Sequence, residues 1–490
     1  MLPNPEAAMT GRLALLAGAL PAVPAPPAPG IPLARCQLAH PLASARVPAR
    51  CGVLDVPEDP ARPDGRKIRL RIAVIPSDSP EAKPDPVFVL AGGPGQSITE
   101  VYPRIAPAFD RLHRERDIVL VDQRGTGGSG LLSCPKIGRP DRDAELLPSE
   151  AGRLAGECAR SLQVDLTRYG TSDFVRDLEA VRAALGYQKV NLVGFSYGTR
   201  AALAYARTHP DRARTLVLDG VAPFQMIIGA DFDRDSQHAL DALFLRCGSD
   251  AACRERYPQL EKDFTDLLVR LDRKPEKVRA RHPVTGEPID LTLDGDALRQ
   301  VVLAFLYTPE TAALIPPLLR QARDGDLAPI AAQGILAVAD IQAGMSRPLQ
   351  LSVLCSEDVP LYADPPPGAP PTFLGNGARE AFRSLCAEWP HAPPDPSFHE
   401  APRMEIPALL LSGEADPVTP PRWADLAALS MPASRQITVP GQGHGILVRG
   451  CLPRVVSEFV KRGNADGLDV SCVERMHPSP IFLDLLGGSP

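Results

Sequence analysis

Short, mostly apolar runs bounded by Gly, Pro or Asp recur along this chain. Their positions are 87–90, 118–121, 190–193, 215–218, 408–411 and 436–439. Runs of this kind are typical of strands that are buried on both faces of a parallel sheet. A different pattern, with alternating apolar residues at 51–56 and 68–76 around a Pro/Asp/Gly turn, predicts an antiparallel hairpin before them.

Helical patterns lie between the predicted strands. The clearest has Phe174, Leu178, Val181 and Leu185 at spacings of 4, 3 and 4. Thr171 or Ser172 would cap this helix, and Gly186 would end it. The alternation of strand and helix predicts an α/β fold with a doubly wound, mostly parallel sheet and right-handed crossovers.

The alternation of predicted strands and helices ends after Phe224. From there to about Glu400 the sequence is helix-rich, with charged faces and Pro breaks, and it contains Pro-rich loops at 364–371 and 390–397. We therefore expect a helical insertion over residues 224–400. It would divide one α/β core into a first part, 31–223, and a C-terminal part, 401–490.

Composition narrows the class of protein. Apolar residues make up 44%, charged residues 23%, and the net charge is −6, which argues against disorder and against a nucleic-acid partner held by broad positive charge. No run of 18 apolar residues occurs, so we expect no membrane span. The 55 prolines are about twice ordinary usage and must lie mainly in loops.

The first 30 residues have the outline of a signal peptide. Arg12 precedes an apolar run at 13–20, which a small, Pro-rich stretch follows. This pattern predicts export to the periplasm, the cell envelope or the medium. The alternative is a Pro/Ala-rich leader without structure.

Ten cysteines fall into close neighbours along the chain. The neighbours are Cys36 and Cys51, Cys134 and Cys158, Cys247 and Cys253, Cys355 and Cys386, and Cys451 and Cys472. No CxxC and no Cys/His cluster with zinc spacing occurs, so five local disulfides are favoured over a metal site. Disulfides also favour export; the alternative is that several thiols are free and buried.

A GxSxG pentapeptide stands at residues 194–198, between a predicted strand and a helix expected over 199–209. A sharp strand-to-helix turn holds its central residue in a strained conformation, and the flanking glycines avoid a clash. Ser196 is therefore the candidate nucleophile, and an inert Ser in a Gly-rich turn is the alternative.

Serine needs a base, and the base needs an acid that orients it. His444 lies in a Gly-rich loop after the last predicted strand, and Asp416 follows the strand at 408–411. Glu414 shares that loop and is the alternative acid. Thr419 and Pro420 would then cap and begin the next helix. The chain order Ser, Asp, His is the order expected for this elbow.

Acyl transfer also needs N–H donors for the oxyanion. One is Tyr197, directly after the nucleophile. The other is expected in the loop at 91–95, where Pro94 has no N–H and Gly93 is the better candidate.

Five motifs now stand in a fixed order: Gly-Gly-Pro-Gly at 92–95, Asp-Gln-Arg-Gly-Thr-Gly-Gly-Ser at 122–129, the elbow at 194–198, Asp-Pro-Val-Thr-Pro at 416–420 and Gly-His-Gly at 443–445. Together they resemble the α/β-hydrolase peptidases of the proline iminopeptidase and tripeptidyl aminopeptidase group. The cysteines, the leader and Pro-Val-Thr after the acid look like the secreted tripeptidyl aminopeptidase branch.

The resemblance implies Ser196, Asp416 and His444 as a catalytic triad and Gly93 and Tyr197 as its oxyanion hole. It also implies that residues 224–400 form a helical cap over the site. One departure is Ala91, where many iminopeptidases have His, so the resemblance implies no side-chain role at that position.

An aminopeptidase must also hold a free ammonium, which needs a carboxylate partner when it is partly buried. Glu357, then Asp358, is the family-like candidate, because the pair follows an apolar run near the end of the insertion. A solvated acidic pair beside a disulfide is the alternative interpretation.

The sequence thus predicts an exported serine exopeptidase that acts on peptides with a free N-terminus through an acyl-enzyme, without metal or cofactor. An esterase or amidase with the same triad is the nearest alternative, because a fold does not fix the substrate. A binding protein that kept the fold without catalysis is the alternative from another class.

Overall fold

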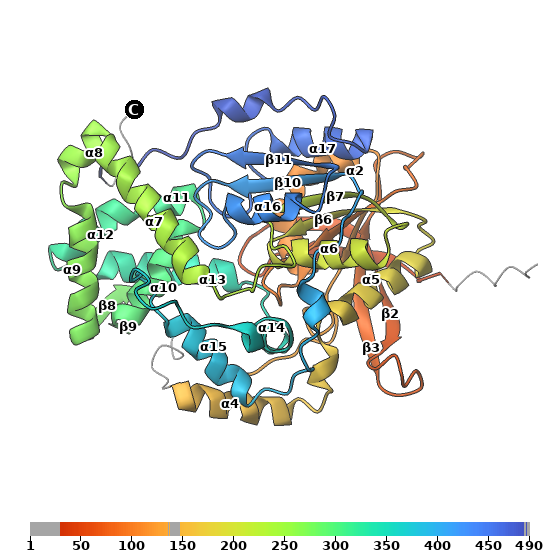
Figure 1. Cartoon of the computed structure of the whole chain (residues 1–490), viewed down its shortest axis with the longest axis horizontal. Helices are drawn as coiled ribbons and strands as arrows, with labels where there is room; N and C mark the ends of the chain where they lie inside the picture. The colour runs from red at the N-terminus through yellow and green to blue at the C-terminus, as the bar shows by residue number, and fades with distance from the viewer. Residues whose placement is uncertain (1–29, 136, 138–147, 485–486, 488–490) are drawn as a thin grey trace, which may run out of the picture.

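A nine-stranded sheet forms the centre of the larger part of the molecule (Figure 1). The computed structural model describes residues 30–135, 137, 148–484 and 487. The strands lie in the order β1-β2-β3-β5-β4-β6-β7-β10-β11. Their bounds are β1 Ala34–Ala39, β2 Arg46–Pro57, β3 Lys67–Ile75, β4 Val87–Leu90, β5 Ile118–Val121, β6 Val190–Phe195, β7 Ala213–Asp219, β10 Ala408–Gly413 and β11 Ser434–Val439.

The pairing confirms a mostly parallel α/β sheet. β1, β2, β3 and β5 pair antiparallel in turn, and every other pair of neighbours is parallel. The six predicted strands and the predicted hairpin of β2 and β3 are all present. Burial on both faces holds for five of the six, whereas β11, at the end of the sheet, buries only Ile437 and Val439. β1 was not predicted, because only Leu38 among its six residues is buried and its apolar signal is correspondingly weak.

Helices cover both faces of the sheet. α1 (Ile98–Ile105), α2 (Asp110–His113) and α17 (Leu452–Arg462) pack on one face, and α5 (Thr171–Ala184), α6 (Tyr197–Thr208) and α16 (Pro421–Ala428) pack on the other. Successive residues of β4 divide between the two cores, with Phe88 in one and Val89 in the other. This alternation is why an uninterrupted apolar run forms the strand.

A helical region is inserted between β7 and β10. Its elements are α7 Phe232–Ser249, α8 Ala251–Arg256, α9 Leu260–Arg273, β8 Glu276–Arg281, β9 Pro288–Leu293, α10 Gly295–Leu306, α11 Pro309–Ala312, α12 Ile315–Arg323, α13 Ala328–Gln342, α14 Arg347–Glu357 and α15 Gly377–Ala387. The antiparallel β8–β9 hairpin was not predicted. Short 3₁₀ helices lie at Ala106–Phe109, Leu166–Arg168, Val359–Leu361, Pro396–His399 and Ser471–Arg475.

Two hydrophobic clusters divide the inserted region. Helices α7 to α13 surround a cluster of their own, which contains Phe264, Val302 and Phe305. In contrast, Cys355 of α14 and Cys386 of α15 belong to the cluster that covers the sheet. The end of the insertion therefore returns to the core, where α15 lies against α4 (Pro148–Ser161) (Figure 1).

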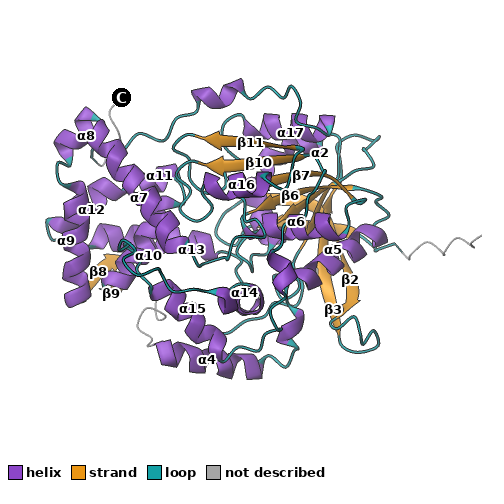
Figure 2. Ribbon diagram, in the orientation of Figure 1, coloured by secondary structure: helices purple, strands orange, loops and turns teal. Residues whose placement is uncertain are grey.

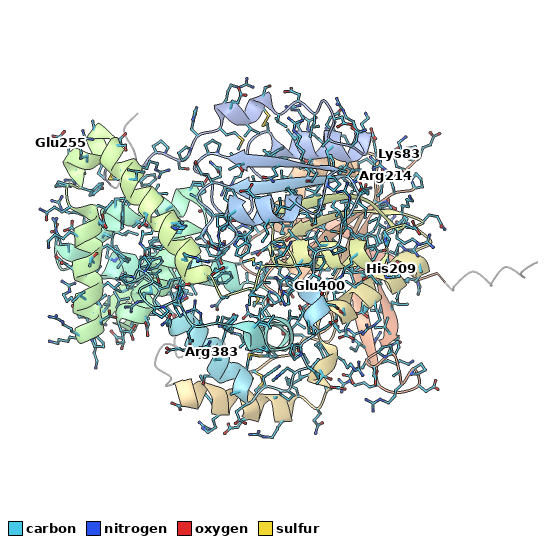
Figure 3. The ribbon with its side chains drawn as sticks, in the orientation of Figure 1. Lys83, His209, Arg214, Glu255, Arg383 and Glu400 are labelled. Carbon is cyan, nitrogen blue, oxygen red and sulfur yellow. A yellow bond between two sulfur atoms is a disulfide. The ribbon has the colours of Figure 1, made fainter. Side chains whose placement is uncertain are left out.

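The carboxyl ends of the parallel strands face the inserted helices. The arrowheads of β10 and β11 point toward that region in Figure 2. Lys83, which precedes β4, and Arg214, near the start of β7, lie at the opposite end of the strands in Figure 3. Loops that follow the strands are therefore held between the sheet and the insertion, which is where ligands bind in open α/β sheets.

The five predicted disulfides are confirmed. Cys36–Cys51, Cys134–Cys158, Cys247–Cys253, Cys355–Cys386 and Cys451–Cys472 are bonded, and the described residues contain no free cysteine. The predicted leader over residues 1–30 lies, apart from Gly30, outside the described residues. Within the described part of the chain, no helix is long and apolar enough to cross a membrane.

Candidate active site

Ser196 sits at the sharp turn between β6 and α6. Its φ of 54° and ψ of −124° are a strained conformation for a residue other than glycine. A Cβ on Gly194 would lie 2.4 Å from the carbonyl oxygen of Gly198, and one on Gly198 would lie 2.4 Å from that of Leu90. The predicted elbow is therefore present, and its glycines are required by close backbone contacts.

His444 and Asp416 meet as the sequence predicts. Nδ1 of His444 lies 2.7 Å from Oδ2 of Asp416. The aspartate is fully buried and also accepts hydrogen bonds from the N–H groups of Val418 and Thr419 and from the Thr419 hydroxyl, at 2.8 to 2.9 Å. The alternative acid, Glu414, instead accepts the N–H of Gly441 at 2.8 Å.

This arrangement sets the charge of the pair. Burial alone would raise the pKa of Asp416, but His444 and the hydrogen bonds from Thr419 and Val418 lower it below its ordinary value. Burial alone would lower the pKa of His444, but Asp416, and Asp219 to a smaller degree, raise it above its ordinary value. A charged aspartate thus orients the imidazole and favours its protonation.

Thr419 departs from its predicted place. It was expected to cap the next helix, but α16 begins at Pro421 with Pro420 as its N-cap. The Thr419 hydroxyl instead donates to Asp416 and lies 3.0 Å from Nδ1 of His444. It therefore supports the orientation of the imidazole.

The strand end and the inserted region both enclose His444. A Cβ on Gly220, directly after β7, would lie 2.9 Å from Cε1 of the imidazole. From the insertion, the carbonyl of Tyr307 accepts the N–H of His444 at 2.8 Å, and the two rings pack edge to face with centroids 5.3 Å apart. Sequence reasoning missed Tyr307, which follows α10 without any local motif.

The loop of Gly93 and the start of α6 at Tyr197, the two candidate oxyanion donors, lie beside Ser196. A Cβ on Gly92, the neighbour of Gly93, would lie 3.0 Å from Cβ of Ser196, so this loop passes beside the serine. Tyr197 is the first residue of α6, where N–H groups have no partner within the helix. Among the residues that the structure describes, none accepts the N–H of Gly93 or Tyr197.

The inserted region also contacts the oxyanion loop. The N–H of Ser346 donates to the carbonyl of Gly95 at 2.8 Å, and the N–H of Ser97 donates to that of Gly344 at 2.9 Å. Met345 lies between them, with its sulfur 3.1 Å from the position that a Cβ on Gly95 would take. The insertion therefore forms part of the wall beside the candidate oxyanion hole.

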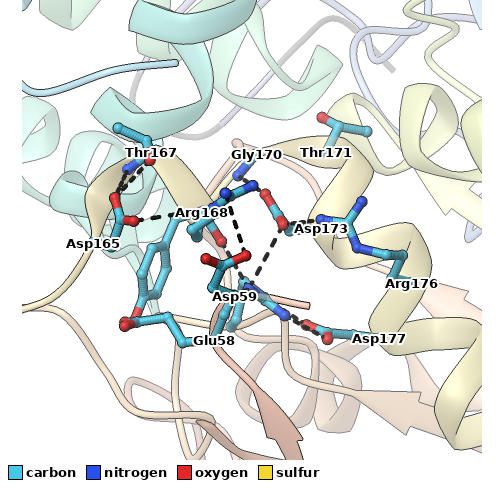
Figure 4. Close-up of polar contacts among 12 residues, drawn as sticks. Glu58, Asp59, Asp165, Thr167, Arg168, Gly170, Thr171, Asp173, Arg176 and Asp177 are labelled. Atoms are coloured by element: carbon cyan, nitrogen blue, oxygen red, sulfur yellow. Dashed lines mark hydrogen bonds and ion pairs between the residues drawn. The ribbon is translucent and has the colours of Figure 1, made fainter. Parts of the chain in front are cut away.

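The motif at residues 122–129 has a structural role. Asp122 accepts hydrogen bonds from Ser97, Thr99 and the N–H of Gly128, at 2.8 to 3.0 Å, and so fixes the start of α1 behind the oxyanion loop. Arg124 binds both oxygens of Asp177 at 2.7 and 2.8 Å. Figure 4 shows the polar cluster around Asp177, which contains Asp59, Arg168 and Asp173.

Glu357 is connected through Thr171 to the side chain of Tyr197, the residue that follows Ser196. Its Oε2 accepts the Thr171 hydroxyl at 2.7 Å, and that hydroxyl oxygen lies 2.8 Å from the hydroxyl of Tyr197. Its Oε1 accepts the N–H of Thr171 at 2.6 Å. Burial and the adjacent Asp358 raise the pKa of Glu357 to about 7, although the bonds from Thr171 lower it.

Asp358, the neighbour of Glu357, has an ion-pair partner within the protein. It is fully buried and binds Arg200 of α6 at 2.8 and 3.1 Å, and it also accepts the N–H of Ile228 at 2.8 Å. Its carboxylate is therefore satisfied within the protein. Among the described residues, no cationic side chain forms such an ion pair with Glu357.

Two family models match this chain. A model of the alpha/beta hydrolase fold matches residues 85–246, and a model of TAP-like proteins matches residues 371–472. Serine protease Hip1 of Mycobacterium tuberculosis is 26% identical, over 89% of this chain and 90% of its own. Tripeptidyl aminopeptidase of Streptomyces lividans is 25% identical, over 88% of this chain and 85% of its own. Proline iminopeptidase of Xylella fastidiosa is 32% identical, over 28% of this chain and 32% of its own.

Proposed function

Because this chain is an α/β hydrolase with a TAP-like C-terminal segment, we propose that it is a serine peptidase that removes short peptides or single residues from the free N-terminus of its substrates. The family match confirms the resemblance that the five sequence motifs carried. A serine hydrolase related to Hip1 and tripeptidyl aminopeptidase is the general class, and the aminopeptidase activity is the specific proposal.

In this proposal Ser196 attacks the scissile carbonyl carbon, and its hydroxyl proton passes to Nε2 of His444. The charged Asp416 holds the imidazole through Nδ1 and stabilises the imidazolium that results. The N–H groups of Gly93 and Tyr197 bind the developing oxyanion. The imidazolium then protonates the leaving amine, and water releases the acyl group by the same steps in reverse order.

The contact that carries the proposal is the 2.7 Å pairing of His444 with Asp416 at the same sheet edge as the strained Ser196. A residue held in this conformation by the flanking strand and helix is typical of the hydrolase nucleophile. The low pKa of Asp416 and the raised pKa of His444 support these roles.

Recognition of a free N-terminus is assigned to Glu357. A carboxylate has about four acceptor positions, and Thr171 occupies two of them, so an ammonium can still bind. The absence of an ion-pair partner among the described residues supports this role, whereas Asp358 already binds Arg200. We therefore favour Glu357 over Asp358 as the amine-binding group.

The disulfides support a location outside the cytoplasm. Five bonded pairs persist in an oxidising environment and are rare in the cytosol. We propose that the protein acts outside the cytoplasm, in the periplasm, the cell envelope or the medium. Peptides with free N-termini are the substrates expected there.

The test compares aminoacyl and tripeptidyl chromogenic amides with their N-blocked forms and with p-nitrophenyl esters. We expect at least a 10-fold preference in kcat/KM for the free N-terminus, since a hydrogen-bonded charge pair contributes about 1.5–3 kcal/mol. Turnover of esters alone would make the protein an esterase and contradict the peptidase proposal. A fluorophosphonate that labels the wild type but not Ser196→Ala would identify the nucleophile; absence of labelling would indicate a non-catalytic protein.

A further inference from the structure

Asp219, the last residue of β7, is a buried carboxylate that no sequence motif singles out. Only 1% of its surface is exposed. Its Oδ1 accepts the N–H of Ile446 at 3.0 Å, and its Oδ2 accepts the N–H of Leu447 at 2.7 Å. The side chain therefore binds the loop two and three residues after His444.

The backbone of the same residue binds the nucleophile. The carbonyl oxygen of Asp219 accepts the N–H of Ser196 at 2.8 Å. The next residue, Gly220, has a φ of 67° and packs against the imidazole of His444. One strand end thus connects the serine and the histidine loop directly.

A carboxylate suits this place better than an amide. Each of its two oxygens receives one N–H, whereas asparagine offers one acceptor oxygen and would place an NH₂ group against the second donor. Among the described residues no cation forms an ion pair with Asp219. The titratable groups that face it are His444 and Asp416, so its charge acts on the imidazole.

We propose that Asp219 is a positioning residue for the reaction proposed above, on which this inference rests. Its carboxylate and carbonyl together fix the spacing between Ser196 and His444. Its charge also stabilises the imidazolium that forms when His444 takes the proton of Ser196.

The charge has a measurable consequence. Burial raises the pKa of Asp219 to about 6, although the bonds from Leu447 and Ile446 lower it. Asp219 also raises the pKa of His444. Removal of the charge should therefore lower the pKa of His444 and move the acid limb of the kcat/KM profile to lower pH.

The test measures kcat and KM against pH for Asp219→Asn with a p-nitrophenyl ester, a substrate for either a peptidase or an esterase with this triad. We expect kcat to fall about 10- to 100-fold at nearly constant KM, because small misplacements of catalytic groups have effects of this size. We also expect the acid limb to move to lower pH.

Asp122→Asn is the matched control. Asp122 is also fully buried and also accepts two backbone N–H groups, but it faces α1 rather than His444. Its variant should leave the acid limb in place. An unmoved limb in Asp219→Asn, or an equal shift in Asp122→Asn, would show that Asp219 is only structural.

Hydrogen exchange on the wild-type protein tests, without any variant, whether Asp219 holds the N–H groups of Ile446 and Leu447. The amides of Ile446 and Leu447 should be as protected as those of the central strands, and their protection should decrease when Asp219 is protonated at low pH. Exchange at the rate of an open loop would overturn the proposal. If the folded protein turns over no substrate, the proposed function fails. The exchange measurement still shows whether Asp219 fixes the histidine loop.

Discussion

The α/β core and the inserted helices contribute to the candidate site in different ways. In the core, each group follows the carboxyl end of a strand: Gly93 follows β4, Ser196 follows β6, Asp416 follows β10 and His444 follows β11. In the insertion, Tyr307, Met345 and Glu357 come from the ends of helices and a loop. The core therefore fixes its groups through one sheet, whereas the insertion depends on how its helices pack.

We therefore expect the core and the insertion to have different roles in the reaction. Groups that share a sheet edge keep a constant geometry, which suits bond making and breaking. Groups on a separate helical layer can vary without disturbing that geometry, which suits the choice of substrate. Changes in the core should thus lower kcat, and changes in the insertion that lie away from His444 should mainly alter KM or stability.

The largest effect is expected in the core, at Asp416. Asp416→Asn removes the charge that orients His444 and stabilises its protonated form, and it should lower kcat by about 10⁴-fold. The control is Glu414→Gln in the same loop, where the amide oxygen can still accept the N–H of Gly441. This control should keep kcat within a few-fold of wild type. A larger loss in Glu414→Gln than in Asp416→Asn would reassign the acid.

The next largest effect is on stability, where the insertion meets the core. Arg200 and Asp358 are fully buried, and Asp358→Ala would leave the arginine charge without its partner. Loss of one member of such a pair costs about 3–5 kcal/mol, so urea unfolding with intact disulfides should occur at a clearly lower concentration. Asp266→Ala, at an exposed pair with Lys262 on α9, should leave the midpoint unchanged. Equal midpoints for both variants would contradict a stabilising role for the Arg200–Asp358 pair.

The same contrast explains what the sequence can predict. Five of the six predicted runs are fully buried, and the sixth, in the edge strand β11, buries Ile437 and Val439. A residue that follows such a strand must lie at the carboxyl end of the parallel strands. Ser196, Asp416 and His444 can therefore be placed on one edge from the order of strands and loops along the chain. Asp219 stands at the same edge, but an aspartate that ends a strand also fits an ordinary turn, and only the fold shows its contacts.

The insertion offers no such rule. Tyr307 reaches His444 only because α10 packs beside the histidine loop, which no local pattern reveals. The β8–β9 hairpin was missed because its buried positions are few, with Val278 and Ala280 alternating with charged residues. Glu357 was predicted from its family-like position and from the need of an aminopeptidase for a carboxylate partner, and its bond to Thr171 joins residues 186 positions apart in the sequence.

Glu357→Gln tests whether the insertion selects the substrate. In the variant the amide oxygen can still accept the N–H of Thr171, and the Thr171 hydroxyl can turn to accept from the amide NH₂ group. The variant loses only the charge that an ammonium needs. We expect KM for free N-terminal peptides to rise about 10- to 100-fold, with little change for esters. In the wild type, KM for these peptides should rise as pH falls below about 7, where Glu357 becomes protonated. Equal losses on peptides and esters would remove the amine-binding role.

Glu357→Gln should also change how the stability of the protein depends on pH. The pKa of Glu357 is about 7 in the fold, above its ordinary value of 4.5, so the unfolded chain loses this proton first as pH rises. The wild type should therefore lose stability between pH 4.5 and about 7, and Glu357→Gln should not show this part of the loss. Denaturant midpoints across that range would measure the difference. Parallel pH profiles for the two proteins would contradict the raised pKa.

Tyr307 is expected to give the smallest effect and the sharpest test of the division between the two regions. Its ring packs edge to face on His444, a contact of about 0.5–1.5 kcal/mol, so Tyr307→Leu should lower kcat about 2- to 10-fold at constant KM. Tyr307→Phe keeps the ring and should retain the wild-type kcat. This pattern would show that one residue of the insertion also supports the chemistry. If Tyr307→Leu instead raised KM alone, the insertion would act only on binding, and the core would contain the whole catalytic apparatus.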